Sequence, residues 1–160
     1  MDTALSLKSA HQKGVISGYA SFFDVTDQHQ DWIAKGAFTK TLRAWRVLGK
    51  MPKMLWQHDP KHPIGVWTFL SEDKCGLYAE GRLALGVRQA DEAYLLLKEG
   101  ILENLSIGFR TVKAVRDKTT NVRLLLDIDL IEISLVTFGA NSRALVRQVK
   151  GRGQCRGRAV

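Results

Sequence analysis

Two stretches of sequence decide the fold of this 160-residue chain: NLSIGF at residues 104–109 and DLIEISLV at residues 129–136. Both are short and rich in the apolar and β-branched residues that favour strands. They belong to two longer strand-like runs, 105–115 and 122–138, which are separated by the polar turn 116–121. The sequence therefore predicts one long antiparallel hairpin near the end of the chain.

Working outward from this hairpin, the remaining pattern predicts short strands and a few helices. Strands are expected at 15–23, 51–56, 63–69 and 77–83, and helices at 36–45, 89–98 and 141–146. The strands follow one another as hairpins rather than as strand–helix–strand units. We therefore predict a mainly antiparallel β fold of six to seven strands, barrel-like, with two to three flanking α-helices.

The domain boundaries follow from composition. Residues 15–148 are predicted to form a single domain, preceded by a flexible N-terminal arm at 1–14 and followed by a basic disordered tail at 149–160. The chain is 45% hydrophobic and 25% charged, which is ordinary for a globular protein. No apolar run approaches the roughly 20 residues needed to span a bilayer, and no secretory signal is present, so we expect no membrane partner.

Charge and cysteine content bound the classes of ligand. The net charge is +8, and the basic residues of the last eleven positions contribute half of it. Such a tail can touch nucleic acid, but the chain lacks a helix-turn-helix, zinc-finger or base-stacking motif, so nucleic acid is not expected as the main function. Cys75 and Cys155 have no histidines nearby, and neither a metal nor a cofactor is predicted.

Three residues on separate elements could form a nucleophilic site. Ser106 begins a predicted strand, His58 follows another beside Asp59, and Glu132 lies within an apolar strand. A serine, a histidine and a carboxylate are the parts of a nucleophilic hydrolase. Gly108, two residues beyond Ser106, should lie on the same strand face and leave room for a substrate.

Pattern alone leaves alternatives open at each position. Ser106 and Glu132 also fit solvent-facing strand residues, and Ser134 is a rival serine in a more apolar setting. His62 competes with His58 as the base. Asp59 is an alternative orienting acid, whereas His11 and His29 fall in segments expected to be solvated.

An ordered set of motifs covers roughly residues 15–146 and carries a family resemblance. The motifs are Gly18-Tyr19-Ala20-Ser21-Phe22-Phe23, Gly36-Ala37-Phe38, Leu55-Trp56-Gln57-His58, Pro63-Ile64-Gly65, Gly76-Leu77, Leu105-Ser106-Ile107-Gly108-Phe109, Leu130-Ile131-Glu132-Ile133-Ser134-Leu135-Val136-Thr137 and Ala140-Asn141. Together they resemble the bacteriophage prohead (capsid maturation) proteases of the HK97 type. That family is similar in fold to the herpesvirus assembly proteases.

The resemblance implies a serine endopeptidase in which Ser106 is the nucleophile, His58 the general base and Glu132 the orienting acid. It would cleave scaffold protein or the N-terminal scaffolding segment of the major capsid protein, and also itself, inside the assembling prohead in the host cytoplasm. Likeness to the dimeric herpesvirus enzymes implies a homo-oligomer, a dimer.

The turn after the last strand, Gly139-Ala140-Asn141, is our candidate for the oxyanion hole. The competing function is a non-catalytic capsid- or scaffold-binding assembly module.

Overall fold

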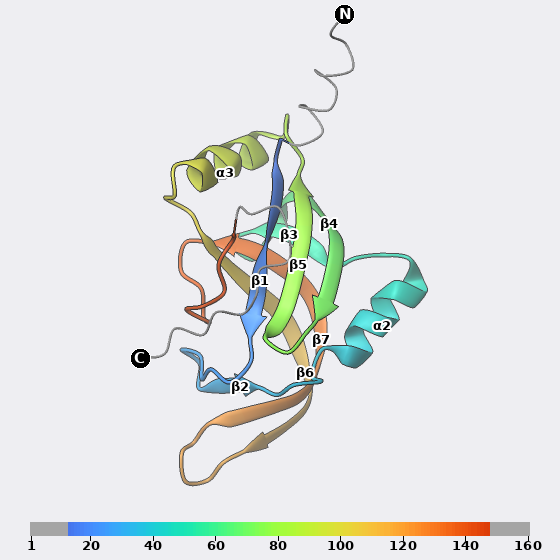
Figure 1. Cartoon of the computed structure of the whole chain (residues 1–160), viewed down its shortest axis with the longest axis vertical. Helices are drawn as coiled ribbons and strands as arrows, with labels where there is room; N and C mark the ends of the chain where they lie inside the picture. Colours follow the sequence, from blue (N-terminus) through green and yellow to red (C-terminus); the bar gives the residue numbers. More distant parts are fainter. Residues whose placement is uncertain (1–12, 148–160) are drawn as a thin grey trace, which may run out of the picture.

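The computed structural model describes residues 13–147, so the predicted arm at 1–14 and tail at 149–160 lie almost wholly outside the described residues. In chain order the elements are β1 (Val15–Phe22), β2 (Asp31–Ile33), α2 (Thr39–Leu48), β3 (Lys53–Trp56), β4 (Asp59–Glu72), β5 (Gly76–Leu83), α3 (Arg88–Lys98), β6 (Asn104–Arg116) and β7 (Arg123–Val136). The described strands form one sheet in the order β1-β5-β4-β3-β7-β2, with β6 paired to β7. The sheet curls like half of a barrel, and the β6–β7 hairpin extends beyond it (Figure 1).

The prediction of a mainly β fold with flanking helices is confirmed, but two of the pairings are not antiparallel. β2 and β3 both run parallel to β7, with Ile33 beside Leu125 and Leu55 beside Ser134. Sequence-adjacent hairpins such as β4–β5 are antiparallel because a tight turn reverses the chain. β2 and β3 instead pair with a strand that comes much later, and no local pattern specifies its direction.

The helix predicted at 141–146 is wrong, and the described residues contain two helices, α2 and α3. Leu145 and Val146 are extended and bridge two strands at opposite ends of the curl, β6 at Asn104 and β1 at Gly18. A Cβ on Gly18 would lie 2.2 Å from the carbonyl oxygen of Leu145, so only glycine permits this approach. The open edges of β1 and β6 supply hydrogen-bond partners, and these outweigh a weak local helix preference.

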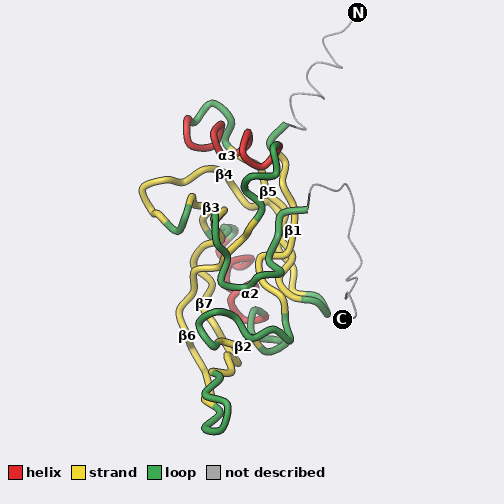
Figure 2. The backbone as a smooth tube through the Cα atoms, turned by 90° about the vertical axis from the view of Figure 1, so that its left-hand side faces the viewer, coloured by secondary structure: helices red, strands yellow, loops and turns green. Residues whose placement is uncertain are grey.

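α3 lies at one end of the molecule and α2 nearer its middle (Figure 2). α3 contacts β4 and β5, whereas α2 contacts β4 and β7. α3 buries Ala90, Ala93 and Leu97, as the predicted helix 89–98 required. α2 begins at Thr39 rather than at residue 36, and Glu72 of β4 holds the segment that leads into it. The Glu72 carboxylate accepts hydrogen bonds from backbone N–H groups at the helix entry, including that of Phe38 at 2.8 Å.

α2 is hydrogen-bonded to an irregular stretch of β7, and this stretch positions the functional site. The indole Nε1–H of Trp45 donates to the carbonyl oxygen of Leu130 at 2.8 Å, and the backbone N–H of Leu130 donates to the hydroxyl of Thr41 at 3.0 Å. Ile131 is the extra residue of a β-bulge, since Gly108 pairs with Glu132 while the next residue of β6 pairs with Leu130. The bulge lets both Leu130 and Ile133 face the core, and it turns Glu132 to the opposite face of the sheet.

Candidate active site

Ser106 and Glu132 are placed on one face of the sheet by the register of β6 and β7. Ser106 lies opposite Ser134, and Gly108 lies opposite Glu132. Side chains of directly opposed residues in an antiparallel pair project to the same face. The serine and the carboxylate therefore lie near each other although 26 positions separate them in the sequence.

His58 reaches this face from the tight turn between β3 and β4. Gln57 and His58 form a two-residue loop and both have positive φ, 51° and 60°. Such a loop normally takes Asn-Gly, so its occupation by two larger side chains stores backbone strain. The Gln57 side chain steadies the turn, because its amide donates to the Thr137 hydroxyl at 2.8 Å and its carbonyl oxygen accepts the Thr137 N–H at 3.1 Å.

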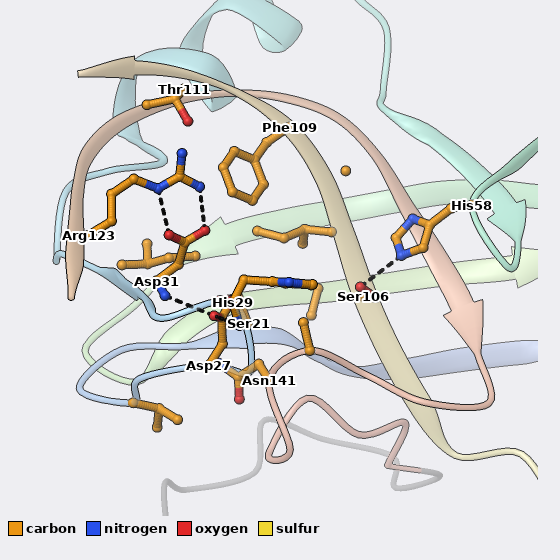
Figure 3. A pocket seen from close by; sticks show the side chains of 16 residues that line it. Ser21, Asp27, His29, Asp31, His58, Ser106, Phe109, Thr111, Arg123 and Asn141 are labelled. Carbon is orange, nitrogen blue, oxygen red and sulfur yellow. Dashed lines mark hydrogen bonds and ion pairs between the residues drawn. The ribbon is translucent and has the colours of Figure 1, made fainter. Parts of the chain in front are cut away.

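The His58 ring joins the serine to the carboxylate. His58 Nε2 lies 2.9 Å from Ser106 Oγ (Figure 3), and His58 Nδ1 is hydrogen-bonded to Glu132 Oε1. An ionised carboxylate can only accept hydrogen bonds, so the ring proton belongs on Nδ1 and the free lone pair of Nε2 points at the Ser106 hydroxyl. The arrangement is a hydroxyl, an imidazole and a carboxylate in line.

Glu132 also sets the protonation of the ring. The hydrogen bond to Glu132 is the main cause that raises the pKa of His58 above its ordinary value of 6.5. Partial burial of the ring opposes this increase, and the negative charge of Glu132 adds to it. The His58 side chain is 42% exposed, so solvent and substrate can reach it, whereas Glu132 is buried.

Ser134, the rival serine, is wholly buried and engaged. Its hydroxyl donates to Glu132 Oε2 at 2.7 Å and accepts the backbone N–H of His58 at 3.1 Å. It therefore cannot present its oxygen to a substrate. From the sequence, this residue is predicted only as a competitor of Ser106, because its contact with His58 joins residues 76 positions apart.

Gly108 has a different use from the one expected. A Cβ at this position would lie 2.2 Å from Glu132 Oε1, much closer than real Cβ atoms approach an oxygen. Gly108 does line the cavity described below, but its missing side chain is what gives the Glu132 carboxylate its place beside His58.

Replacing Gly108 with alanine should therefore displace Glu132 and uncouple it from His58. Because a misplacement of about 1 Å can cost roughly 100-fold in rate, we expect Gly108→Ala to lower kcat/KM by about that factor. Steady-state assays of the activity proposed below would measure it. Gly100→Ala is the control. A Cβ at Gly100 would meet no atom within 4 Å, and the positive φ of 67° makes the substitution costly for the backbone alone, so it should lose stability without losing rate. Unchanged turnover in Gly108→Ala would contradict the role assigned to this glycine.

A cavity of about 570 Å³ opens beside Ser106 and His58. Figure 3 shows Ser106 and His58 at one end and the ion pair of Arg123 with Asp31 at the other. The guanidinium donates to both Asp31 oxygens, each at 2.6 Å. This pair ties β2 to β7 and forms the far wall, which the sequence did not indicate.

The loop that enters β2 forms another side of the cavity. Asp27 Oδ1 accepts the backbone N–H groups of His29 at 2.8 Å and Asp31 at 2.9 Å, which shapes this loop. His29 was expected to be solvated, and it is exposed in the structure; it also lines the cavity near Asp27 (Figure 3). Long-range packing of β2 on β7 brings this segment to the site.

The candidate oxyanion residues lie beside this cavity. Ala140 and Asn141 line it, while Gly139 lies near the Leu105 carbonyl oxygen. Among residues 13–147 no acceptor takes the backbone N–H of Gly139, Ala140 or Asn141. These donors are thus unpaired in the described part of the chain and remain candidates for binding a developing oxyanion.

The alternative residues lie apart from the site. His62 Nδ1 bonds Asp59 Oδ2 at 2.8 Å, and neither residue lines the cavity; His11 lies outside the described residues. Asp59 is therefore hydrogen-bonded to His62 and not to His58.

The described residues hold no cluster of three or more potential metal ligands. No helix among them is long and apolar enough to cross a membrane.

Known proteins of similar fold include two viral proteases. The structure of the bacteriophage T4 capsid assembly protease, gp21, has a TM-score of 0.63 at 14% identity, over 76% of this chain and 80% of that one. KSHV protease, in complex with a hexapeptide phosphonate inhibitor, has a TM-score of 0.55 at 15% identity, over 82% of this chain and 63% of that one. The predicted likeness in fold to herpesvirus proteases is confirmed.

Two sequence relatives are prohead proteases of other phages. The prohead protease of Enterobacteria phage HK97 is 31% identical over 151 residues, which cover 93% of this chain and 66% of the relative. The prohead protease of Escherichia phage T5 is 32% identical over 139 residues, covering 85% and 64%. The chain thus spans just under two thirds of the length of either relative. The sequence pattern of the caudovirus prohead serine proteases matches residues 3–155, and the chain therefore belongs to that family.

Proposed function

We propose that this protein is a serine endopeptidase that cleaves scaffold protein, or the N-terminal scaffolding segment of the major capsid protein, during phage prohead maturation, and that it also cleaves itself. One observation carries the proposal. The imidazole of His58 lies between Ser106 Oγ, at 2.9 Å from Nε2, and the carboxylate of Glu132. Three separate strands or turns bring these groups together beside an open cavity.

The geometry supports a two-step acyl transfer. His58 Nε2 takes the hydroxyl proton as Ser106 Oγ attacks the scissile carbonyl, and it then gives that proton to the leaving amine. Glu132 keeps the proton on Nδ1 and stabilises the imidazolium. Water, activated by the same imidazole, then hydrolyses the acyl-enzyme. The free N–H groups at 139–141 are the proposed donors to the oxyanion of each tetrahedral intermediate.

The free edge of β6 supports an extended polypeptide as substrate. β6 pairs with β7 on one side, and beyond residue 105 no described strand pairs with its other side. Ser106 and its next three residues line the cavity along this edge. A peptide can add to such an edge as a further strand, and its backbone then lies beside the nucleophile.

The proposed partners and location follow from family membership. The major capsid protein and scaffold protein are the proposed substrates, and the proposed place of action is the interior of the assembling prohead in the host cytoplasm. We also propose that the protein acts as a homodimer. Contact of the basic tail with nucleic acid would be secondary to proteolysis.

Co-expression with the phage's own capsid and scaffold proteins tests the proposal. Intact mass spectrometry should show a discrete truncation with the wild-type chain and full-length proteins with Ser106→Ala. The truncated mass also locates the cleavage site.

Full-length capsid and scaffold proteins in both samples would overturn the proposal and favour the non-catalytic assembly module. Equal truncation in both samples would also overturn it, because cleavage would then not depend on Ser106.

A further inference from the structure

A single buried hydroxyl joins the carboxylate of the site to the backbone of its histidine. Ser134 is 0% exposed, and its Oγ donates to Glu132 Oε2 at 2.7 Å while accepting the His58 N–H at 3.1 Å. Ser134 lies on β7 between Leu55 of β3 and Ser106 of β6. It is thus the cross-strand neighbour of the proposed nucleophile.

The chemistry of these contacts requires a hydroxyl. Glu132 Oε2 needs a donor and the backbone N–H of His58 needs an acceptor, and a hydroxyl is both at once. Among residues 13–147, no other group donates to Glu132 Oε2. An alanine at this position would leave a buried carboxylate oxygen and a backbone N–H without partners.

The location of the two contacts indicates what they achieve. His58 holds a left-handed backbone conformation, with φ at 60°, which costs free energy and needs fixed partners. Glu132 follows the β-bulge at Ile131 and could rotate if only His58 held it. The Ser134 Oγ atom is hydrogen-bonded both to the Glu132 carboxylate and to the backbone of His58, so the imidazole and the carboxylate keep their relative position.

We infer that Ser134 is a positioning residue that acts through Glu132 and His58 and extends the proposed triad to four linked side chains. This inference rests on the proposed protease function. It predicts that loss of the Ser134 hydroxyl lowers the rate of the chemical step and leaves substrate binding largely unchanged.

The kinetic test compares Ser134→Ala with wild type on the cleaved capsid or scaffold protein. We expect kcat to fall by about 10- to 100-fold, with KM within about twofold, because positioning acts on the transition state. In a Glu132→Gln background the same change should have little further effect, because residues that act through one another are not additive. An equal fold loss in both backgrounds, or a loss confined to KM, would overturn the inference.

Two further measurements separate positioning from simple loss of stability and from failure of the protease proposal. Ile16→Val removes one buried methyl group from β1, and it should lower the melting temperature without changing kcat. The second measurement needs no substrate. In the inactive Ser106→Ala protein, the proton NMR signal of His58 Nδ1–H should shift or broaden when Ser134→Ala is added. An unchanged signal would overturn the inference even if the protease activity holds, and a changed signal would support it even if no substrate is cleaved.

Discussion

Ser106→Ala and His58→Ala should each reduce the rate of capsid- or scaffold-protein cleavage by about 10³- to 10⁶-fold, and the double variant should lose no more than either single one. Ser106 Oγ and His58 Nε2 are 2.9 Å apart, and nucleophilic attack needs both groups because the imidazole must accept the hydroxyl proton. Single-turnover assays on purified protein, with time courses of many hours, would measure the residual rates.

His62→Ala is the matched control for this prediction. His62 is four residues from His58 and also bonds a carboxylate, yet it does not line the cavity. It should keep the wild-type rate. Multiplicative losses in the double variant, or loss of activity in His62→Ala, would mean that the general base is assigned to the wrong histidine.

Glu132→Gln should reduce kcat by about 10²- to 10⁴-fold and move the pH profile. The amide of a glutamine can donate to Nδ1, which places the ring proton on Nε2 and removes the lone pair that must accept the Ser106 proton. His58 must be neutral to act as a base. In the wild type, activity therefore falls as the pH drops through a pKa raised above 6.5 by Glu132.

The direction of the pH change follows from the same contacts. Loss of the carboxylate removes both causes that raise the pKa of His58, so burial dominates and its pKa falls. The acid limb of kcat/KM against pH should then move to lower pH, which a pH-rate series would show.

Asp59→Asn, which breaks the other carboxylate–histidine pair, serves as the control and should leave the limb in place. An acid limb that moves with Asp59→Asn and not with Glu132→Gln would reverse the assignment.

Local patterns predicted those elements whose partners are close in sequence. The helix expected at 89–98 is α3, the strands expected at 63–69 and 77–83 lie in the hairpin β4–β5, and the late hairpin is β6–β7. The parallel pairing of β2 and β3 with β7 and the extended path at Leu145 and Val146 were not predictable. Each depends on hydrogen-bonding edges that become available only when distant strands have already assembled.

The candidate site divides in the same way. Family motifs singled out Ser106, His58 and Glu132, and these three side chains are in contact. The residues that hold them, Ser134 and Gly108, could not be assigned these uses from sequence. A one-residue bulge at Ile131 reverses which face of β7 points outward, so counting along the strand misplaces everything beyond it.

By itself, the sequence determined the family, the mainly β character of the domain, and which residues can act as a nucleophile and as a proton acceptor. Periodicity and motif spacing report those properties because they act between near neighbours along the chain. Only the tertiary structure decided that Ser134 joins Glu132 to His58, that Gly108 yields space to a carboxylate, and that Arg123 and Asp31 close the cavity. Apart from the Ser134–Glu132 bond within β7, these contacts join different elements of the chain. The bulge at Ile131 and the left-handed turn at His58, which shape the site, arise from packing rather than from local preference.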